Sequence, residues 1–150
     1  MKIINVWNDL KLDSYGVELY FSKSRTELIR FLEENNIPMT MLTDMKIVVK
    51  SKILSLDFSF YISCQFDDEK MIAITMSPNT ALEGKCLLRR YRIIQKALEY
   101  ELGPPRNRLR SIMCVFDPEN RSSYWMRNDI KIEHYLSSRF GTEENINIQL

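Results

Sequence analysis

The sequence predicts an α+β fold in which a predominantly antiparallel sheet of about six to eight strands carries two main helices on one face. Three observations predict it: one long stretch of alternating apolar and polar residues, two amphipathic helical patterns, and a last third of short alternating segments joined by turns. Two helices are too few for a doubly wound parallel sheet. The 150 residues are expected to form a single domain, residues 1–150.

The first strand and helix are predicted in residues 15–38. Residues 15–21 alternate between apolar and polar side chains, which is typical of a strand. Ser24 and Glu27 then have the spacing of a capping box, which begins a helix. Its buried side is expected to carry Leu28, Phe31 and Leu32, and residues 35–38 end it because a proline disfavours helical backbone in the residue before it.

The longest alternation runs over residues 54–66 and predicts an unusually long or bulged strand. A shorter strand is expected before it, at residues 46–50. Residues 67–70 form a turn, and the return strand should bury Ile72, Ile74 and Met76. The side of the long strand that faces the core is predicted to carry Leu54, Leu56, Phe58, Phe60, Ile62, Cys64 and Phe66.

The second helix is predicted to begin after Thr80, which has a capping-box partner in Glu83, and to end at Leu102. Gly103 and the two prolines after it prevent continuation. Four further strands are expected, at residues 109–116, 122–126, 130–136 and 145–150. The apolar stripe of the helix consists of Leu87, Tyr91, Ile94, Leu98 and Leu102.

Composition excludes several classes of protein. The 21 basic and 20 acidic side chains give a net charge of +1, which does not indicate a general polyanion binder. Residues 1–10 lack the apolar core of a secretory signal, and no stretch approaches the ~20 apolar residues of a membrane span. The widely spaced Cys64, Cys86 and Cys114 are expected to be reduced core thiols, so the predicted compartment is the cytoplasm.

No pattern of catalytic, cofactor-binding or metal-binding residues is present in the sequence. The single histidine, His134, is in register with Ile132 and Leu136, so it is expected to be a core residue. The acidic turn at residues 67–69 lacks the ligand spacing of a calcium loop, and no serine lies in a nucleophile elbow. The chain is therefore expected to be non-enzymatic, without a cofactor or metal.

Basic residues cluster around the second helix. Lys85, Arg89, Arg92 and Lys96 are spaced by 4, 3 and 4 residues and are offset from the apolar stripe, so they predict an exposed basic ridge. Residues 85–110 hold eight basic and two acidic side chains, a local charge of +6, while the rest of the chain sums to −5. Three interpretations stay open: a merely solvated helix face, a surface for an acidic protein, and a nucleic-acid contact.

A second group of candidates combines aromatic and basic side chains in the strand at 122–126 and its flanks. Tyr124 and Trp125 point to opposite faces of a strand, so at most one of them is expected in the core. Aromatic residues among arginines occur in protein hot spots and in base-stacking sites. The partner-binding candidates are Lys85, Arg89, Arg92, Lys96, Arg106, Arg108, Arg121, Tyr124, Trp125 and Arg127.

Residues 124–132, followed by residues 134–135 and 139–141, resemble the C-terminal meanders of small uncharacterised bacterial α+β proteins, some of them immunity-like proteins of polymorphic toxin systems. The resemblance implies an interaction protein and no particular site residue. The leading hypothesis is a non-enzymatic protein-binding module, an immunity-type inhibitor of a toxin or effector with an acidic surface. The alternative is binding of nucleic acid or another polyanion through residues 85–110.

Overall fold

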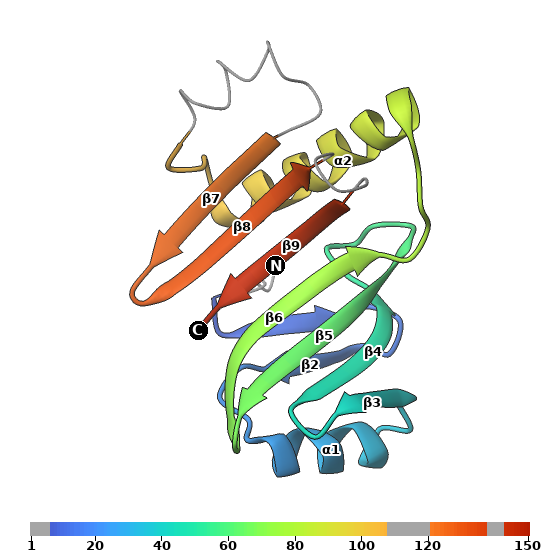
Figure 1. Cartoon of the computed structure of the whole chain (residues 1–150), viewed down its shortest axis with the longest axis vertical. Coiled ribbons are helices and arrows are strands. Elements are labelled where there is room, and N and C mark those ends of the chain that lie inside the picture. Colours follow the sequence, from blue (N-terminus) through green and yellow to red (C-terminus); the bar gives the residue numbers. More distant parts are fainter. Residues whose placement is uncertain (1–6, 108–120, 138–142) are drawn as a thin grey trace.

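The computed structural model describes residues 7–107, 121–137 and 143–150. Over these residues the chain forms nine strands and two helices (Figure 1). In chain order they are β1 (Asp9–Leu12), β2 (Val17–Tyr20), α1 (Arg25–Glu34), β3 (Met39–Thr43), β4 (Lys46–Lys52), β5 (Ser59–Asp67), β6 (Lys70–Pro78), α2 (Gly84–Leu102), β7 (Arg121–Arg127), β8 (Ile130–Ser137) and β9 (Glu143–Gln149).

Seven of these strands form one antiparallel sheet in the order β3-β4-β5-β6-β9-β8-β7. The last strand of the chain, β9, lies between β6 and β8 and so joins the N-terminal and C-terminal strands into one sheet. The strands β1 and β2 pair only with each other. The predicted α+β class and antiparallel sheet are confirmed.

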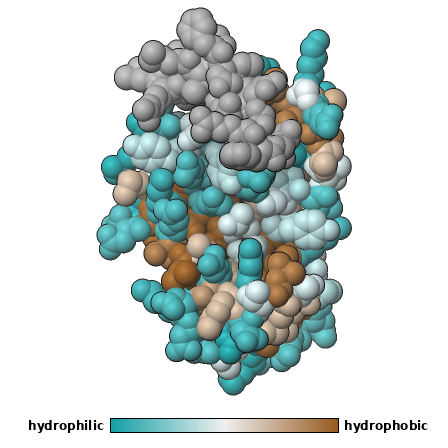
Figure 2. All heavy atoms as spheres, viewed as in Figure 1, coloured by the Kyte–Doolittle hydropathy of each residue, from teal (hydrophilic) through white to brown (hydrophobic). Residues whose placement is uncertain are grey.

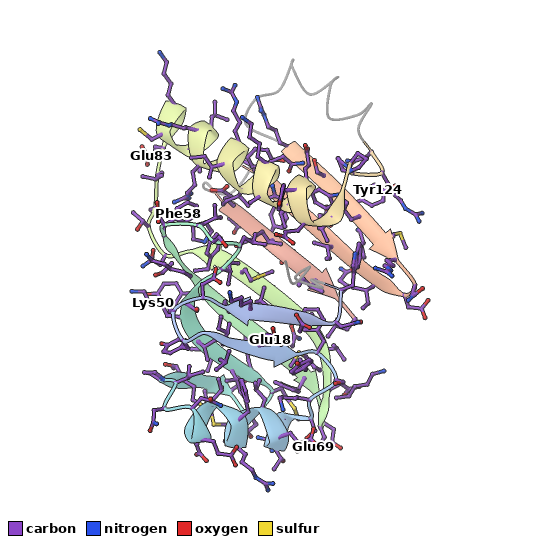
Figure 3. All side chains as sticks on the ribbon, turned by 180° about the vertical axis from the view of Figure 1, so that it is seen from behind. Glu18, Lys50, Phe58, Glu69, Glu83 and Tyr124 are labelled. Carbon is purple, nitrogen blue, oxygen red and sulfur yellow. The ribbon has the colours of Figure 1, made fainter. Side chains whose placement is uncertain are left out.

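Among the described residues, one face of the sheet is covered by other elements, and the opposite face, called the open face below, is not (Figure 1). Seen from behind, α2 crosses β7 to β9, while the β1-β2 hairpin and α1 lie over the β3 to β6 side (Figures 1 and 3). The hairpin is tied to β4 by the Asp13 amide, which donates to the Lys52 carbonyl at 2.9 Å. Both helices therefore lie on the same face, as the sequence predicts, and the hairpin is an additional part of that layer.

The core lies between the sheet and this covering layer. The predicted alternation holds in β5, where Phe60, Ile62, Cys64 and Phe66 are all buried. Burial also raises the pKa of the Cys64 thiol to about 12, because the thiolate would lose its hydration there. Where Figure 2 shows it, the sheet face opposite the core carries mostly polar residues, and its hydrophobic residues form separate groups.

The long strand predicted over residues 54–66 is wrong in its first part. Leu54 and Ser55 both have a φ of 56°, and the Leu56 amide donates to the Ile53 carbonyl, so this segment is a turn. Leu54, Leu56 and Phe58 are only partly buried, although they still pack against the core. Alternation alone does not distinguish a strand from a turn whose apolar residues fold back onto the core.

The return strand β6 also departs from the predicted register. A bulge between Gln65 and Phe66 places one extra residue in β6, so the core side chains are Met71, Ile74 and Met76. Ile72, which the alternation predicts to be buried, is half-buried instead.

The two predicted helix starts have opposite outcomes. The capping box of α1 is confirmed, because the Glu27 amide donates to Ser24 Oγ at 3.2 Å and the Ser24 amide donates to the Glu27 carboxylate at 2.8 Å. The capping box predicted for α2 is wrong. Its N-cap is Glu83, which makes no side-chain cap bond, and Thr80 lies outside the helix.

The remaining strand predictions agree with the structure where it describes them. The strands β7, β8 and β9 match three predicted segments, and the strand predicted at 109–116 lies outside the described residues, as does Cys114. The sequence patterns did not indicate β1 and β3. Cys86 is exposed, contrary to the predicted core thiol. In the described part of the chain, neither helix is long and apolar enough to cross a membrane.

Candidate functional site

The outer face of α2 is the basic ridge that the sequence predicts. Leu87, Tyr91, Ile94 and Leu98 are buried against the sheet, which turns the opposite side of the helix to solvent. All four ridge residues are exposed: Lys85, Arg89, Arg92 and Lys96. Within the described ranges none of the four forms an ion pair. Their charges are therefore open to a partner.

Two exposed hydrophobic side chains lie beside this ridge. Ile93 is 41% exposed and follows Arg89 by four residues, and Tyr100 is 73% exposed and follows Lys96 by four. Residues four apart are neighbours on a helix surface. The outer face of α2 thus combines cations with apolar side chains, and we call these six residues, the ridge together with Ile93 and Tyr100, the α2 surface.

The other predicted candidates do not form one surface with the ridge. Arg106 and Arg127 are exposed, whereas Arg121 is half-buried with its guanidinium carbon 6.0 Å from the Tyr91 ring under α2. Tyr124 is half-buried on the open face of the sheet, where Lys131 Nζ lies 5.7 Å from its ring centroid. Arg108 lies outside the described residues.

Trp125 is wrong as a partner-binding candidate. It is 2% exposed, and its indole Nε1 donates to the Gly103 carbonyl at 2.8 Å. Successive side chains of a strand point to opposite faces, so Trp125 lies on the covered face of β7 and Tyr124 on the open face. Its role is to anchor the end of α2 to the sheet.

A buried polar cluster lies between α2 and the sheet, and apart from His134 the sequence patterns did not indicate it. Arg90 Nε donates to Glu144 Oε2 at 2.8 Å, and both side chains are nearly buried. Arg90 also donates to the Thr80 carbonyl, which connects α2 to the segment that leads into it. A signal was present in the sequence: Arg90 follows Leu87 by three residues on the helix, and Glu144 alternates with Ile146 and Ile148 on the strand.

His134 is buried at the centre of this cluster, as predicted, with no exposed surface. Gln95 Nε2 donates to Glu99, and this bond turns the Gln95 Oε1 toward His134 Nδ1, 2.8 Å away. Because Gln95 Oε1 can only accept, Nδ1 carries the proton. The imidazole stacks on Tyr91 with ring centroids 4.1 Å apart, and its Nε2 lies 3.5 Å from Glu144 Oε1. Burial lowers the pKa of His134, and the Glu144 carboxylate opposes this shift.

An open cavity of about 590 Å³ lies at the outer end of the cluster, with Arg90 and Glu144 in its wall. It forms because β6 and β9 pair only from Ala73 to Met76, after which β6 leads away toward α2. The Arg90 charge is already opposed by Glu144 there. Among the residues that the structure describes, no three His, Cys, Asp or Glu side chains gather in a way that would hold a metal ion.

Comparisons of the chain with protein-family models, with curated proteins and with solved structures found no match.

Proposed function

We propose that this protein is a protein-binding module whose α2 surface contacts an acidic face of its partner. The observation that carries the proposal is the set of four exposed cations in register on one helix, with Ile93 and Tyr100 beside them. From Lys85 to Lys96 this row extends over about 17 Å at 1.5 Å per residue. That length suits a protein interface, in which arginine and tyrosine are enriched at the centre.

The hydrophobic neighbours favour a protein over a nucleic acid as the partner. A phosphate backbone rewards cations alone, whereas a protein interface also buries apolar side chains. The immunity-type inhibitor is the more specific form of this proposal. Such an inhibitor acts by covering its target, so it needs exposed contact residues and no catalytic group. The alternative, polyanion binding through residues 85–110, would use the same cations without Ile93 and Tyr100.

The test compares two charge-reversal variants as baits in affinity purification from the native host. Arg89→Glu/Arg92→Glu reverses the middle of the ridge, and Arg30→Glu/Lys70→Glu makes the same change in net charge at positions of α1 and β6 outside the α2 surface. Mass spectrometry should find a protein that the wild type and the control retain and the ridge variant loses. If every captured protein is retained equally by both variants, the α2 surface is not the binding site.

A salt series with a fluorescent DNA duplex separates the alternative. The proposal expects weak duplex binding that is lost at about 200 mM salt. The Ile93→Ser/Tyr100→Ser variant should bind the duplex as weakly as the wild type does. Tight duplex binding at about 200 mM salt that the ridge variant abolishes would favour the polyanion binder. Loss of the captured protein in Ile93→Ser/Tyr100→Ser would support a protein interface.

A further inference from the structure

The strand β3 forms an edge of the sheet that the described residues leave open. Its five residues contain no charged side chain and pair on one side only, with β4. Three of the large hydrophobic side chains that are exposed lie in or just after it: Met41 at 46%, Leu42 at 60% and Met45 at 43%. An uncharged edge with exposed hydrophobic residues can pair with another strand.

The opposite edge, β7, is blocked. The Arg106 amide donates to the Tyr124 carbonyl at 2.9 Å, and the Asn107 side chain donates to the Ser122 carbonyl at 2.9 Å and accepts from the Tyr124 amide at 3.1 Å. Residues 106–107 thus occupy backbone groups of β7 that another strand would need. In the described part of the chain no comparable segment hydrogen-bonds to the outer side of β3.

A groove of about 440 Å³ lies next to β3 on the open face of the sheet. Leu42, Val48 and Tyr61 supply apolar lining, and Lys46 lies among them. The same face of β4 also carries Lys50 and Lys52, so this face has three lysines just inside the edge. Lys50 Nζ lies 6.0 Å from the Tyr61 ring centroid. The open face beside the edge therefore combines lysines with apolar side chains, and Met41 lies on the opposite, covered face.

These features define the chemistry of a segment that fits there. Unpaired backbone N–H and C=O groups are matched by an extended segment, which adds a strand to the sheet. Three lysines on one face favour carboxylates on the matching face of that segment, and Met41 favours apolar side chains on its other face. A second copy of this chain would bring its own lysines to the same side. An edge of five residues, about 17 Å long, would bury less surface than the roughly 1,200–2,000 Å² of a stable dimer interface.

We propose that β3 and its lysine-lined groove form a docking site for an extended acidic segment of a partner protein, which adds to the sheet as a further strand. This site is distinct from the α2 surface. It lies toward the β3 end of the sheet, where Figure 3 labels Lys50, whereas α2 lies across β7 to β9 and begins at the labelled Glu83. The proposal therefore stands or falls independently of the function proposed for α2.

The test uses a fluorescent heptapeptide in which glutamate alternates with valine, and the matching peptide with lysine in place of glutamate. Fluorescence anisotropy should show binding of the glutamate peptide to the full chain at about 50 mM salt, and at least about tenfold weaker binding of the lysine peptide. NMR should place the largest amide shifts in residues 39–43. Binding of neither peptide, or equal binding of both, would overturn the proposal.

Matched variants place the site at one edge. Met41→Glu puts a carboxylate on the covered face of β3, where the valines of the bound peptide would lie, and should weaken binding of the glutamate peptide by about tenfold or more. Met126→Glu makes the same change at a residue that is 41% exposed on β7 and should leave binding unchanged. Lys46→Glu/Lys50→Glu should reverse the preference, so that the lysine peptide binds more tightly. Equal weakening by Met41→Glu and Met126→Glu would contradict docking at β3.

Sedimentation velocity of the free protein tests whether a second copy of the chain occupies the β3 edge. The proposal expects the same sedimentation coefficient for the wild type and for Met41→Glu. A wild-type dimer that Met41→Glu converts to a monomer would show that the edge pairs with a second copy, and it would overturn the acidic segment as the occupant.

Discussion

The two ends of a single row of side chains differ sharply in burial. On the covered face of the sheet, cross-strand pairing aligns Trp125, Ile132, Ile148, Ile74, Cys64, Ile47 and Met41. Trp125 at the β7 end is 2% exposed, whereas Met41 at the β3 end is 46% exposed. The five residues between them are all buried. Both ends belong to edge strands, so position in the sheet does not explain the difference.

The two edges differ in the chain that lies beyond them. At β7 the end of α2 reaches over the sheet, Gly103 accepts a hydrogen bond from Trp125, and residues 106–107 pair with the strand from outside. At β3 the described chain supplies no such segment. The segment that follows α2 thus closes the β7 edge, whereas in the described chain no hydrogen bond occupies the outer backbone groups of β3, although α1 lies beside that strand (Figure 1).

The largest expected effect on stability is at the closed end. Trp125→Ala should lower the free energy of unfolding by about 3–5 kcal/mol, because it empties a buried site and leaves the Gly103 carbonyl without its donor. The exposed Met126→Ala on the same strand should change it by less than about 0.5 kcal/mol. Urea denaturation measures both. Equal effects would show that the closed end is not packed as described.

The side chain that blocks β7 should have a smaller effect. Asn107→Ala removes a donor to Ser122 and an acceptor for Tyr124, so a loss of about 1–2 kcal/mol is expected. Asn107→Asp keeps an acceptor for the Tyr124 amide but turns a carboxylate oxygen toward the Ser122 carbonyl, so it should also be less stable than the wild type. If urea denaturation finds either variant as stable as the wild type, the two hydrogen bonds do not act as assigned.

Acidification should destabilise the end of the sheet that α2 covers. The pKa of His134 is lower in the folded protein than the ordinary value of 6.5, so between these two values the unfolded chain binds a proton that the folded chain does not. The stability that His134 contributes is therefore present above about pH 6.5 and decreases as the pH falls toward its folded pKa. His134→Gln should show a shallower loss of stability between about pH 7 and about pH 5. A slope identical to that of the wild type would contradict the shift.

The smallest effect is expected at the open end. Met41→Ala should change the free energy of unfolding by less than about 1 kcal/mol, because a side chain that is 46% exposed gives up little buried area. A loss as large as that of Trp125→Ala would mean that β3 is covered in solution.

Much of this architecture could be predicted from local sequence patterns. The alternation in β5, the Ser24 capping box and the stripe of α2 were sufficient to predict the class of the fold and the exposure of the basic ridge. The same patterns failed at residues 54–58, because a turn with two left-handed residues can still direct apolar side chains to the core. They failed at Thr80 because a capping-box spacing does not require the helix to begin there.

The open edge and the buried polar cluster depend on contacts that no local pattern contains. The Asn107 side chain meets Ser122 across 15 residues, and Arg90 meets Glu144 across 54. The strand β3 has no regular alternation of charge and hydrophobicity to mark it, and its residues are mostly exposed. Only the order of the seven strands shows that β3 is an edge and that Trp125 and Met41 share a row.

Amide hydrogen exchange on the free protein tests the difference between the two edges most directly. The Tyr124 amide, which donates to Asn107, should exchange at least about tenfold more slowly than the unpaired amides of residues 39–43, and Asn107→Ala should abolish its protection. The glutamate peptide should then slow exchange in residues 39–43 and leave Tyr124 unchanged. Equal protection of both edges in the free protein would contradict an open β3 edge.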